Sequence, residues 1–402
     1  MFLFKKGCDI LGNDFLFWLG DIILKKRLVQ TMAVLLFMLV LVVAVVRTPH
    51  TRSTVPAVVE IEEADRDSGK VDYLAMSEKE LLVLAYDGDA EACYRLGVMY
   101  DYGAGGVQQN FTSALEWYRT ADAYGQTQAA AGIGYLYLNG CGVDKDTEAA
   151  RQYFARSVAL GDPQGYVGLG RVGLDTGGDE PEIFSNIKTA KDAGLLDGTY
   201  YLGYLYEKGI GTKRRAKKAY RLYQKTAESD SEAIEDQYAI HAARTRLGIL
   251  YMEGIGVDAD RSAAREQFET AADDGYAMAQ YYLGIMYEMG YGMPIDYARA
   301  LDYFELAAQQ DYAPALNEIG CMYFNGHGVE TNFEQAVYYQ KLAAALGYEK
   351  AQVNLGYLYE NGYGVEQNLQ TALTYYQMAK ETGYAGADEA EARVRARLEN
   401  EE

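Results

Sequence analysis

A motif close to Leu-Gly-x-x-Tyr recurs along most of this chain at an almost fixed interval. Eight glycines mark its copies, and successive copies are 37, 36, 33, 45, 36, 36 and 36 residues apart. A period near 36 is typical of an α-solenoid, in which each helical unit buries its apolar faces only by stacking on its neighbours. We therefore expect an all-α, right-handed solenoid of about eight antiparallel helix-turn-helix units. The glycines are Gly97, Gly134, Gly170, Gly203, Gly248, Gly284, Gly320 and Gly356.

The eighth copy indicates how one unit is built. Apolar residues recur at helical spacing over 351–359. The run ends at Gly362 and Gly364, because glycine takes the left-handed conformation that terminates a helix at little steric cost. Asn368 is then placed to cap a second helix over 369–380. The same cap position holds Asn110, Asp146, Asp260, Asp296 and Asn332.

Each anchoring glycine falls in the middle of its expected first helix, where Gly costs about 1 kcal/mol relative to Ala. A cost repeated in every unit indicates a shared packing reason, and we expect the second helix to approach closely at this glycine. The tyrosine three residues later lies one turn on, and we interpret it as core; a ladder of ligand-binding tyrosines is the alternative. These are Tyr100, Tyr137, Tyr206, Tyr251, Tyr287, Tyr323 and Tyr359.

The pattern resembles the Sel-one-like repeat (SLR) family, longer cousins of the tetratricopeptide repeats. The family motif is seen in Leu283-Gly284, Tyr287, Gly290, Gly292, Ala300, Tyr303-Phe304 and Ala307-Ala308, and the resemblance covers residues 77–383. It implies a scaffold or adaptor, without enzymatic activity, that binds a protein or peptide along a concave face lined by the first helices. Because some secreted family members are associated with β-lactams, the alternative is an envelope hydrolase or binding protein acting on β-lactams or peptidoglycan.

The N-terminal region predicts a membrane anchor. Residues 28–46 are apolar except for Gln30 and Thr31, and a run of 19 residues is long enough to span a bilayer as a helix. More Lys and Arg precede this run than follow it closely, so we expect residues 1–27 to face the cytoplasm and the repeats to be extracytoplasmic. In a Gram-negative bacterium that compartment is the periplasm.

The rest of the chain divides by composition. Residues 47–70 predict a flexible acidic stalk, and 71–93 an N-terminal half-repeat that begins with a capping box formed by Ser77 and Glu80. We assign the solenoid to 94–383. Residues 384–402 are mostly charged and predict a capping helix or a tail.

Charge and chemistry exclude several functions. The net charge of −21 opposes binding to phosphate backbones, so we expect no nucleic-acid partner. Three histidines and four cysteines without zinc-ligand spacing indicate no metal site, and no cofactor motif is present. We expect no disulfide between Cys93 and Cys141, which lie near opposite ends of equivalent helices. The run from Ser185 to Lys188 matches the Ser-x-x-Lys motif of penicillin-recognising enzymes, but its partner motifs are absent.

Tyrosines at two positions of the first helices are candidate binding residues. Positions three before and one after each anchoring glycine are four residues apart and share a face. If this face lines the groove, its tyrosines form a partner-binding track; the alternative is that they pack neighbouring first helices together. A polysaccharide or peptidoglycan strand is a further ligand that such a track would fit. The candidates are Tyr94, Tyr135, Tyr200, Tyr204, Tyr281 and Tyr357.

Two departures from the repeat are candidate functional features. The first is a basic block in the fourth unit, where Arg215 replaces the usual capping residue against the helix dipole. It either contacts an acidic partner or is a solvated face that relieves charge repulsion. The second is an insertion over 228–241, which we expect to extend the second helix or to form an edge loop. The block consists of Lys213, Arg214, Arg215, Lys217 and Lys218.

The expected topology is testable with protease. Spheroplasts that express the chain with a C-terminal tag should lose the tag on external digestion, because the repeats are expected outside the cytoplasm. A tag that survives while a control periplasmic domain is cut would show that the orientation is reversed.

Overall fold

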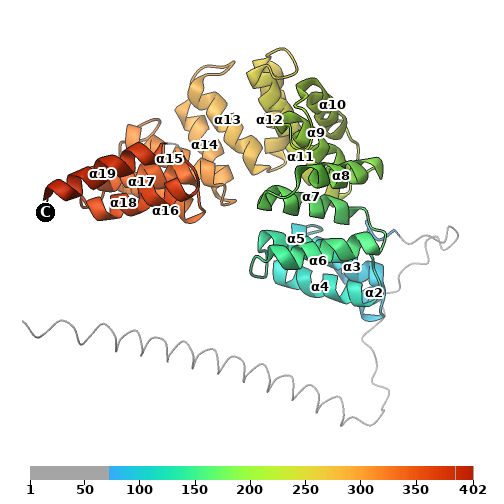
Figure 1. Cartoon of the computed structure of the whole chain (residues 1–402). Coiled ribbons are helices and arrows are strands. Elements are labelled where there is room, and N and C mark those ends of the chain that lie inside the picture. Colours follow the sequence, from blue (N-terminus) through green and yellow to red (C-terminus); the bar gives the residue numbers. More distant parts are fainter. Residues whose placement is uncertain (1–71, 385, 402) are drawn as a thin grey trace, which may run out of the picture. The chain divides into compact units, whose positions relative to one another are not determined.

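The computed structural model describes residues 72–384 and 386–401, which form eighteen α-helices and no strands (Figure 1). The segments expected at 1–27, 28–46 and 47–70 lie outside these residues. Within the described ranges, no helix is both long and apolar enough to cross a bilayer.

Sixteen of the helices form eight consecutive pairs, which confirms the expected all-helical repeat architecture. The first helices of units one to eight are α3 (Ala90–Tyr102), α5 (Ala129–Asn139), α7 (Gln164–Thr176), α9 (Leu196–Lys208), α11 (Ile234–Glu253), α13 (Ala277–Met289), α15 (Ala313–Asn325) and α17 (Glu349–Asn361). The second helices are α4 (Phe111–Ala123), α6 (Thr147–Ala159), α8 (Glu180–Asp192), α10 (Ala216–Ala227), α12 (Arg261–Asp273), α14 (Tyr297–Ala308), α16 (Phe333–Ala345) and α18 (Leu369–Glu381). Two flanking helices, α2 (Glu78–Tyr86) and α19 (Ala387–Glu401), complete the set.

The anchoring glycines lie where the two helices of a unit approach each other, as expected. A Cβ atom added to Gly284 would lie 2.5 Å from Cε1 of Phe304, which is fully buried on α14. At Gly356 the same atom would lie 2.5 Å from Cε1 of Tyr376 on α18. A side chain larger than hydrogen therefore cannot fit without moving the ring. The close approach explains why glycine is kept in mid-helix despite its low helix propensity.

The second helices are capped as the sequence predicts. The side chains of Asn110, Asp146, Asp260, Asp296, Asn332 and Asn368 each accept a hydrogen bond from a backbone N–H of the first turn. Asp179 does the same for α8. Arg215, at the start of α10, makes no such bond. The entry to α10 is therefore the exception among the second helices.

The first helices form the inner layer of the stack. Each of α3, α5, α7, α9 and α11 contacts the first helix of the next unit as well as its own partner. Consecutive second helices make no contacts of comparable extent. This difference places the first helices on the side where neighbouring units are closest together, and the second helices on the outer side.

Polar groups close both ends of the described stack. At the start, the Ser77 backbone N–H donates to Glu80 Oε2 at 2.7 Å, which confirms the predicted capping box. At the other end, α19 packs against α18, and Arg393 and Arg397 donate to Glu360 of α17 at 2.7–3.0 Å. Of the two forms expected for the C-terminal segment, the structure therefore shows the helix.

We expect Gly284→Ala to destabilise the stack locally. The added methyl group forces the Phe304 ring to move, and overpacking of this kind costs about 1–3 kcal/mol. Hydrogen exchange should increase first in α13, α14 and the adjoining units, because each unit is stabilised mainly by its neighbours. Glu305→Ala, at an exposed position of the same pair, is the control. Equal acceleration from α3 to α18 would contradict the repeat model.

Candidate functional site

The tyrosines three positions before the glycines lie mainly within the units. Tyr94 and Tyr200 are only 8% and 7% exposed. Their rings lie 5.8 Å and 5.7 Å from those of Tyr118 and Tyr223 on the paired second helices. The half-buried Tyr281 contacts Phe304 and Tyr312 in a similar way. These three candidates contribute to packing, and a role in partner binding remains a prediction for them.

The tyrosines one position after the glycines are more accessible. Tyr135 and Tyr204 are partly buried and stack under guanidinium groups, with Arg171 5.1 Å from the first ring and Arg246 5.3 Å from the second. Tyr357 is 44% exposed. The inner layer therefore presents aromatic rings at these positions, and their role as a binding track is untested.

Charged groups accompany these rings in the inner layer. Arg171 lies between the rings of Tyr135 and Tyr201, at 5.1 Å and 5.9 Å. Burial raises the pKa of the Asp197 carboxyl to about 6, and nearby Arg171 partly offsets that effect. Burial also raises the pKa of Asp101 to about 6, against a hydrogen bond from Tyr118. The inner layer thus contains carboxylates that take up protons in mildly acidic solution.

The insertion corresponds in part to one of its two expected forms. An extension of the second helix was wrong, because α10 ends at Ala227, whereas residues 228–233 form a loop that connects α10 to α11. The remaining residues lengthen α11 at its N-terminal end to 20 residues, whereas the other first helices have 11–13. The physical reason is that Ile234 gains an apolar partner there, since it packs against the core of the first two units.

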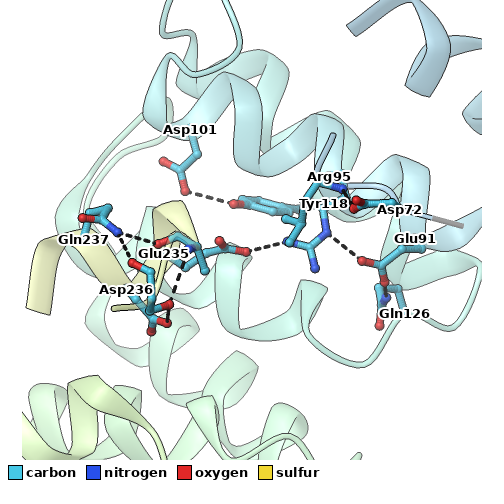
Figure 2. A network of polar contacts seen from close by, with 12 residues as sticks. Asp72, Glu91, Arg95, Asp101, Tyr118, Gln126, Glu235, Asp236 and Gln237 are labelled. Carbon is cyan, nitrogen blue, oxygen red and sulfur yellow. Dashed lines mark hydrogen bonds and ion pairs between the residues drawn. The ribbon is translucent and has the colours of Figure 1, made fainter. Parts of the chain in front are cut away.

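A polar network joins this extension to the first unit (Figure 2). Arg95 on α3 donates through Nη1 to Oε1 of Glu235 on α11 at 2.9 Å, and through Nε to Glu91 at 2.7 Å. On the α11 side, Ser231 Oγ donates to Asp236 at 2.6 Å. The chain's own insertion therefore contacts the inner side of α3 and bridges units one and five.

The basic block lies at the start of α10. All five of its cations are exposed, and Lys218 is held by Tyr206, whose hydroxyl lies 2.8 Å from Nζ. Arg214 donates to the Glu207 carbonyl at 3.0 Å. Arg215 occupies the N-cap without capping, which forgoes about 1 kcal/mol relative to Asn or Asp. Lys213, Arg214, Arg215, Lys217 and Lys218 are thus all exposed around the start of α10, and the last three also line one surface depression.

A polar cluster in unit seven was not anticipated. Gln340 occupies the position opposite Gly320 where most other units have an aromatic ring, and it is 2% exposed. Its amide donates to the Asn317 carbonyl at 3.0 Å and approaches Cys321 Sγ at 3.6 Å, while Asn354 donates to Asn317 Oδ1 at 2.9 Å. The signal in the sequence was the replacement of an aromatic residue by glutamine at a core position.

The described residues offer little support for catalytic chemistry. Ser185 is exposed on α8, and Lys188 donates to Asp192 at 2.7 Å. The hydrogen bond to Asp192 raises the pKa of Lys188 above its usual value, which favours the charged form of the amine. Across 72–384 and 386–401 no group of His, Cys, Asp or Glu is arranged to hold a metal ion, and three thiols are free.

A sequence model of the Sel1 repeat matches seven stretches that together make up more than half of the chain. The chain belongs to the Sel1 repeat family. The matches cover residues 90–121, 127–162, 196–231, 241–276, 277–312, 313–348 and 349–384. The helix pair α7 and α8 falls between two matches and is the least typical Sel1 repeat of the stack.

Two curated relatives share shorter stretches. One is the ERAD-associated E3 ubiquitin-protein ligase component HRD3B of Arabidopsis thaliana, 30% identical over 26% of this chain and 17% of the relative. The other is the chitin synthase regulator SKT5 of Saccharomyces cerevisiae, 31% identical over 40% of this chain and 23% of the relative. The chain thus spans less than a quarter of either relative.

Solved Sel1 repeat structures resemble the chain over a greater length. A Sel1 repeat protein from Oxalobacter formigenes is 23% identical, with a TM-score of 0.47, over 86% of this chain and 97% of that one. A protective antigen of uropathogenic Escherichia coli with an SLR fold is 27% identical, with a TM-score of 0.42, over 80% of this chain and 68% of that one.

We expect Glu235→Gln to loosen the insertion. Neutralising this carboxylate weakens the ion pair to Arg95, which is only 19% exposed, at a cost of about 1 kcal/mol. Amides over 231–238 should exchange about fivefold faster. Glu232→Gln, an exposed change in the same segment, should leave exchange unaltered. Identical exchange in the two variants would show that the ion pair does not hold the insertion in place.

Proposed function

We propose that this Sel1 repeat protein is a membrane-anchored scaffold or adaptor that binds a protein or peptide partner along the inner, concave face of its solenoid. The anchor is residues 28–46, the repeats are extracytoplasmic, and the protein has no catalytic activity of its own. The apolar run and its flanking charges support the anchor and the orientation.

The observation that carries the binding proposal is an accessible group of aromatic rings in units seven and eight. Phe324 lies 5.3 Å from Phe333 and 6.1 Å from Tyr357. Tyr363 completes the group, 5.1 Å from Phe333 and 5.9 Å from Tyr357. All four rings are partly or largely accessible. Such rings offer large contact areas at low entropic cost and are frequent at binding hot spots.

The aromatic group of units seven and eight is also a better candidate for the partner-binding site than the first unit. The insertion already contacts the inner side of α3 through Glu235 and Ile234. A partner that bound there would have to displace it. Within the described residues the insertion makes no contact with the aromatic rings of units seven and eight, so a partner can bind these rings without rearrangement of the chain.

The names of the two relatives support an accessory role. One is called a component of an E3 ubiquitin-protein ligase and the other a regulator of chitin synthase, so each is named for an enzyme that it accompanies. We propose by analogy that the present chain positions or regulates a partner protein. A polysaccharide or peptidoglycan strand is the second class of ligand that the aromatic rings would fit.

We expect Tyr357→Ser to abolish capture of the partner after crosslinking in membranes. The ring is 44% exposed, so its loss should change the free energy of unfolding by less than about 1 kcal/mol. Tyr338→Ser removes a ring that is somewhat more accessible, 54% exposed, from the outer helix α16. This control should retain capture.

The opposite pattern would overturn the proposal. If Tyr338→Ser abolished capture and Tyr357→Ser retained it, the partner would bind the outer helices. Capture retained by both variants would exclude the aromatic group of units seven and eight as the binding site. Thermal unfolding of each variant separates lost binding from lost folding.

A further inference from the structure

Helix α10 differs from every other second helix in its charge. It carries Lys217, Lys218, Arg221 and Lys225 and no Asp or Glu, whereas each of the other seven described second helices contains at least one acid. All four cations are exposed. This concentration of positive charge lies on a chain whose net charge is −21.

These cations lack counterions within the described residues. Lys217, Arg221 and Lys225 form no ion pair or hydrogen bond there, and Lys218 contacts only the hydroxyl and ring of Tyr206. Several exposed cations on other second helices have a carboxylate partner, as in Arg156 with Asp122 at 2.8 Å, whereas Arg119, Arg261 and Lys341 contact tyrosines without an ion pair in the described part of the chain. The positive charge of α10 therefore remains available to another molecule.

The fold keeps these cations although they disfavour the helix. Arg215 stands at the N-cap position that Asp or Asn occupies in the other second helices, and makes no capping bond. Lys217 and Lys218 in the first turn oppose the helix dipole. Cations at a helix N-terminus, with no nearby contact that offsets their cost, are the kind of unfavourable local feature that is expected at functional sites.

The surface is also hollowed. Arg215, Lys217, Lys218, Arg221 and Lys225 line an open depression of about 920 Å³ together with Ala216, Leu222 and Gly256. Gly256 belongs to the turn of the next unit and has a left-handed φ of 76°, and a Cβ there would lie 2.6 Å from the Ala216 carbonyl carbon. The lining of the depression is thus mostly cationic, with an apolar contribution from Leu222.

The spacing of the cations fits an extended acidic chain. Lys217, Arg221 and Lys225 follow each other at four-residue intervals, which is about 6 Å along a helix. Side chains two residues apart in an extended peptide are about 6.4–6.8 Å apart and point to the same side. Carboxylates at alternate positions of a peptide can therefore face successive cations.

From these observations we propose that the depression on α10 is a docking site for a short, extended segment of a partner protein that carries Asp or Glu at alternate positions. This site lies on the outer layer and goes beyond the inner-face binding described above. A short segment contacts only the basic surface. A nucleic acid or an anionic membrane extends further than the screening length of about 8 Å and meets the acidic remainder of the chain.

The test uses the full-length protein and a fluorescein-labelled peptide of alternating Glu and Ser, about 12 residues long. Fluorescence anisotropy at about 25 mM salt should show binding that weakens at about 150 mM salt. The same peptide with Gln in place of Glu should not bind. The combined variant Lys217→Gln, Arg221→Gln and Lys225→Gln should bind the acidic peptide at least about tenfold more weakly.

A matched variant separates local contact from overall charge. Arg156→Gln, Lys188→Gln and Arg299→Gln together remove three exposed cations from other second helices, each of which has its own carboxylate partner. This variant should bind the peptide as the wild type does. Equal losses in both triple variants would overturn the proposal, as would absence of binding to the wild type.

Two further probes test the class of partner. Single-stranded DNA and phosphatidylserine vesicles should bind more weakly than the peptide. Tighter binding of either probe that depends on Lys217, Arg221 and Lys225 would assign the site to a polyanion or a membrane and overturn the peptide proposal. Tyr357→Ser should leave peptide binding unchanged, so this site and the inner aromatic group can fail independently.

Discussion

The contact between the anchoring glycine and a buried side chain of the second helix sets the geometry of each unit. At Gly284 and Gly356 a Cβ would fit only if a ring moved, because Phe304 and Tyr376 lie against the backbone. The two helices of a unit are therefore closer together than they could be if the first helix carried a side chain at the glycine position. Such a compact unit buries its remaining apolar side chains against the next unit, and repetition of this contact forms the stack. The contact is local, which explains why it is visible in the sequence as a period.

The same contact shows how far a unit can depart from the pattern. In unit three, Ile187 takes the place of the ring opposite Gly170, and the motif weakens until no repeat match is found there. In unit seven, Gln340 fills the same place and brings amide groups into the core. Both units still form a helix pair because their neighbours supply the apolar surface that they lack. Sequence variation in one unit is therefore tolerated as long as the adjoining units are regular.

Contacts within one unit could be predicted from the sequence, whereas contacts between distant units could not. The helix pairs, the caps and the glycine contact depend on residues within one unit, and the sequence predicted them. The ion pair between Arg95 and Glu235 joins residues 140 apart, and no periodic signal marks it. The spacing of 45 revealed the insertion but not which helix it lengthens. Tyr357, one residue after its glycine, is exposed, whereas Tyr200, three residues before its glycine, is buried. The four-residue spacing of these two positions indicates a shared helix face, but it does not tell which position is the more exposed.

A solenoid has no single central core, so its surface can change in one unit without affecting the others. Two departures from the repeat, the basic surface of α10 and the extension of α11, are adjacent in the chain. The first lies on the outer layer and the second on the inner layer. Both place charge unlike that of a regular unit: a cation, Arg215, stands at a cap position that holds Asp or Asn elsewhere, and Glu235 lies against the first unit. Because each unit is stabilised by local contacts with its neighbours, this junction can carry charges that serve contacts rather than packing.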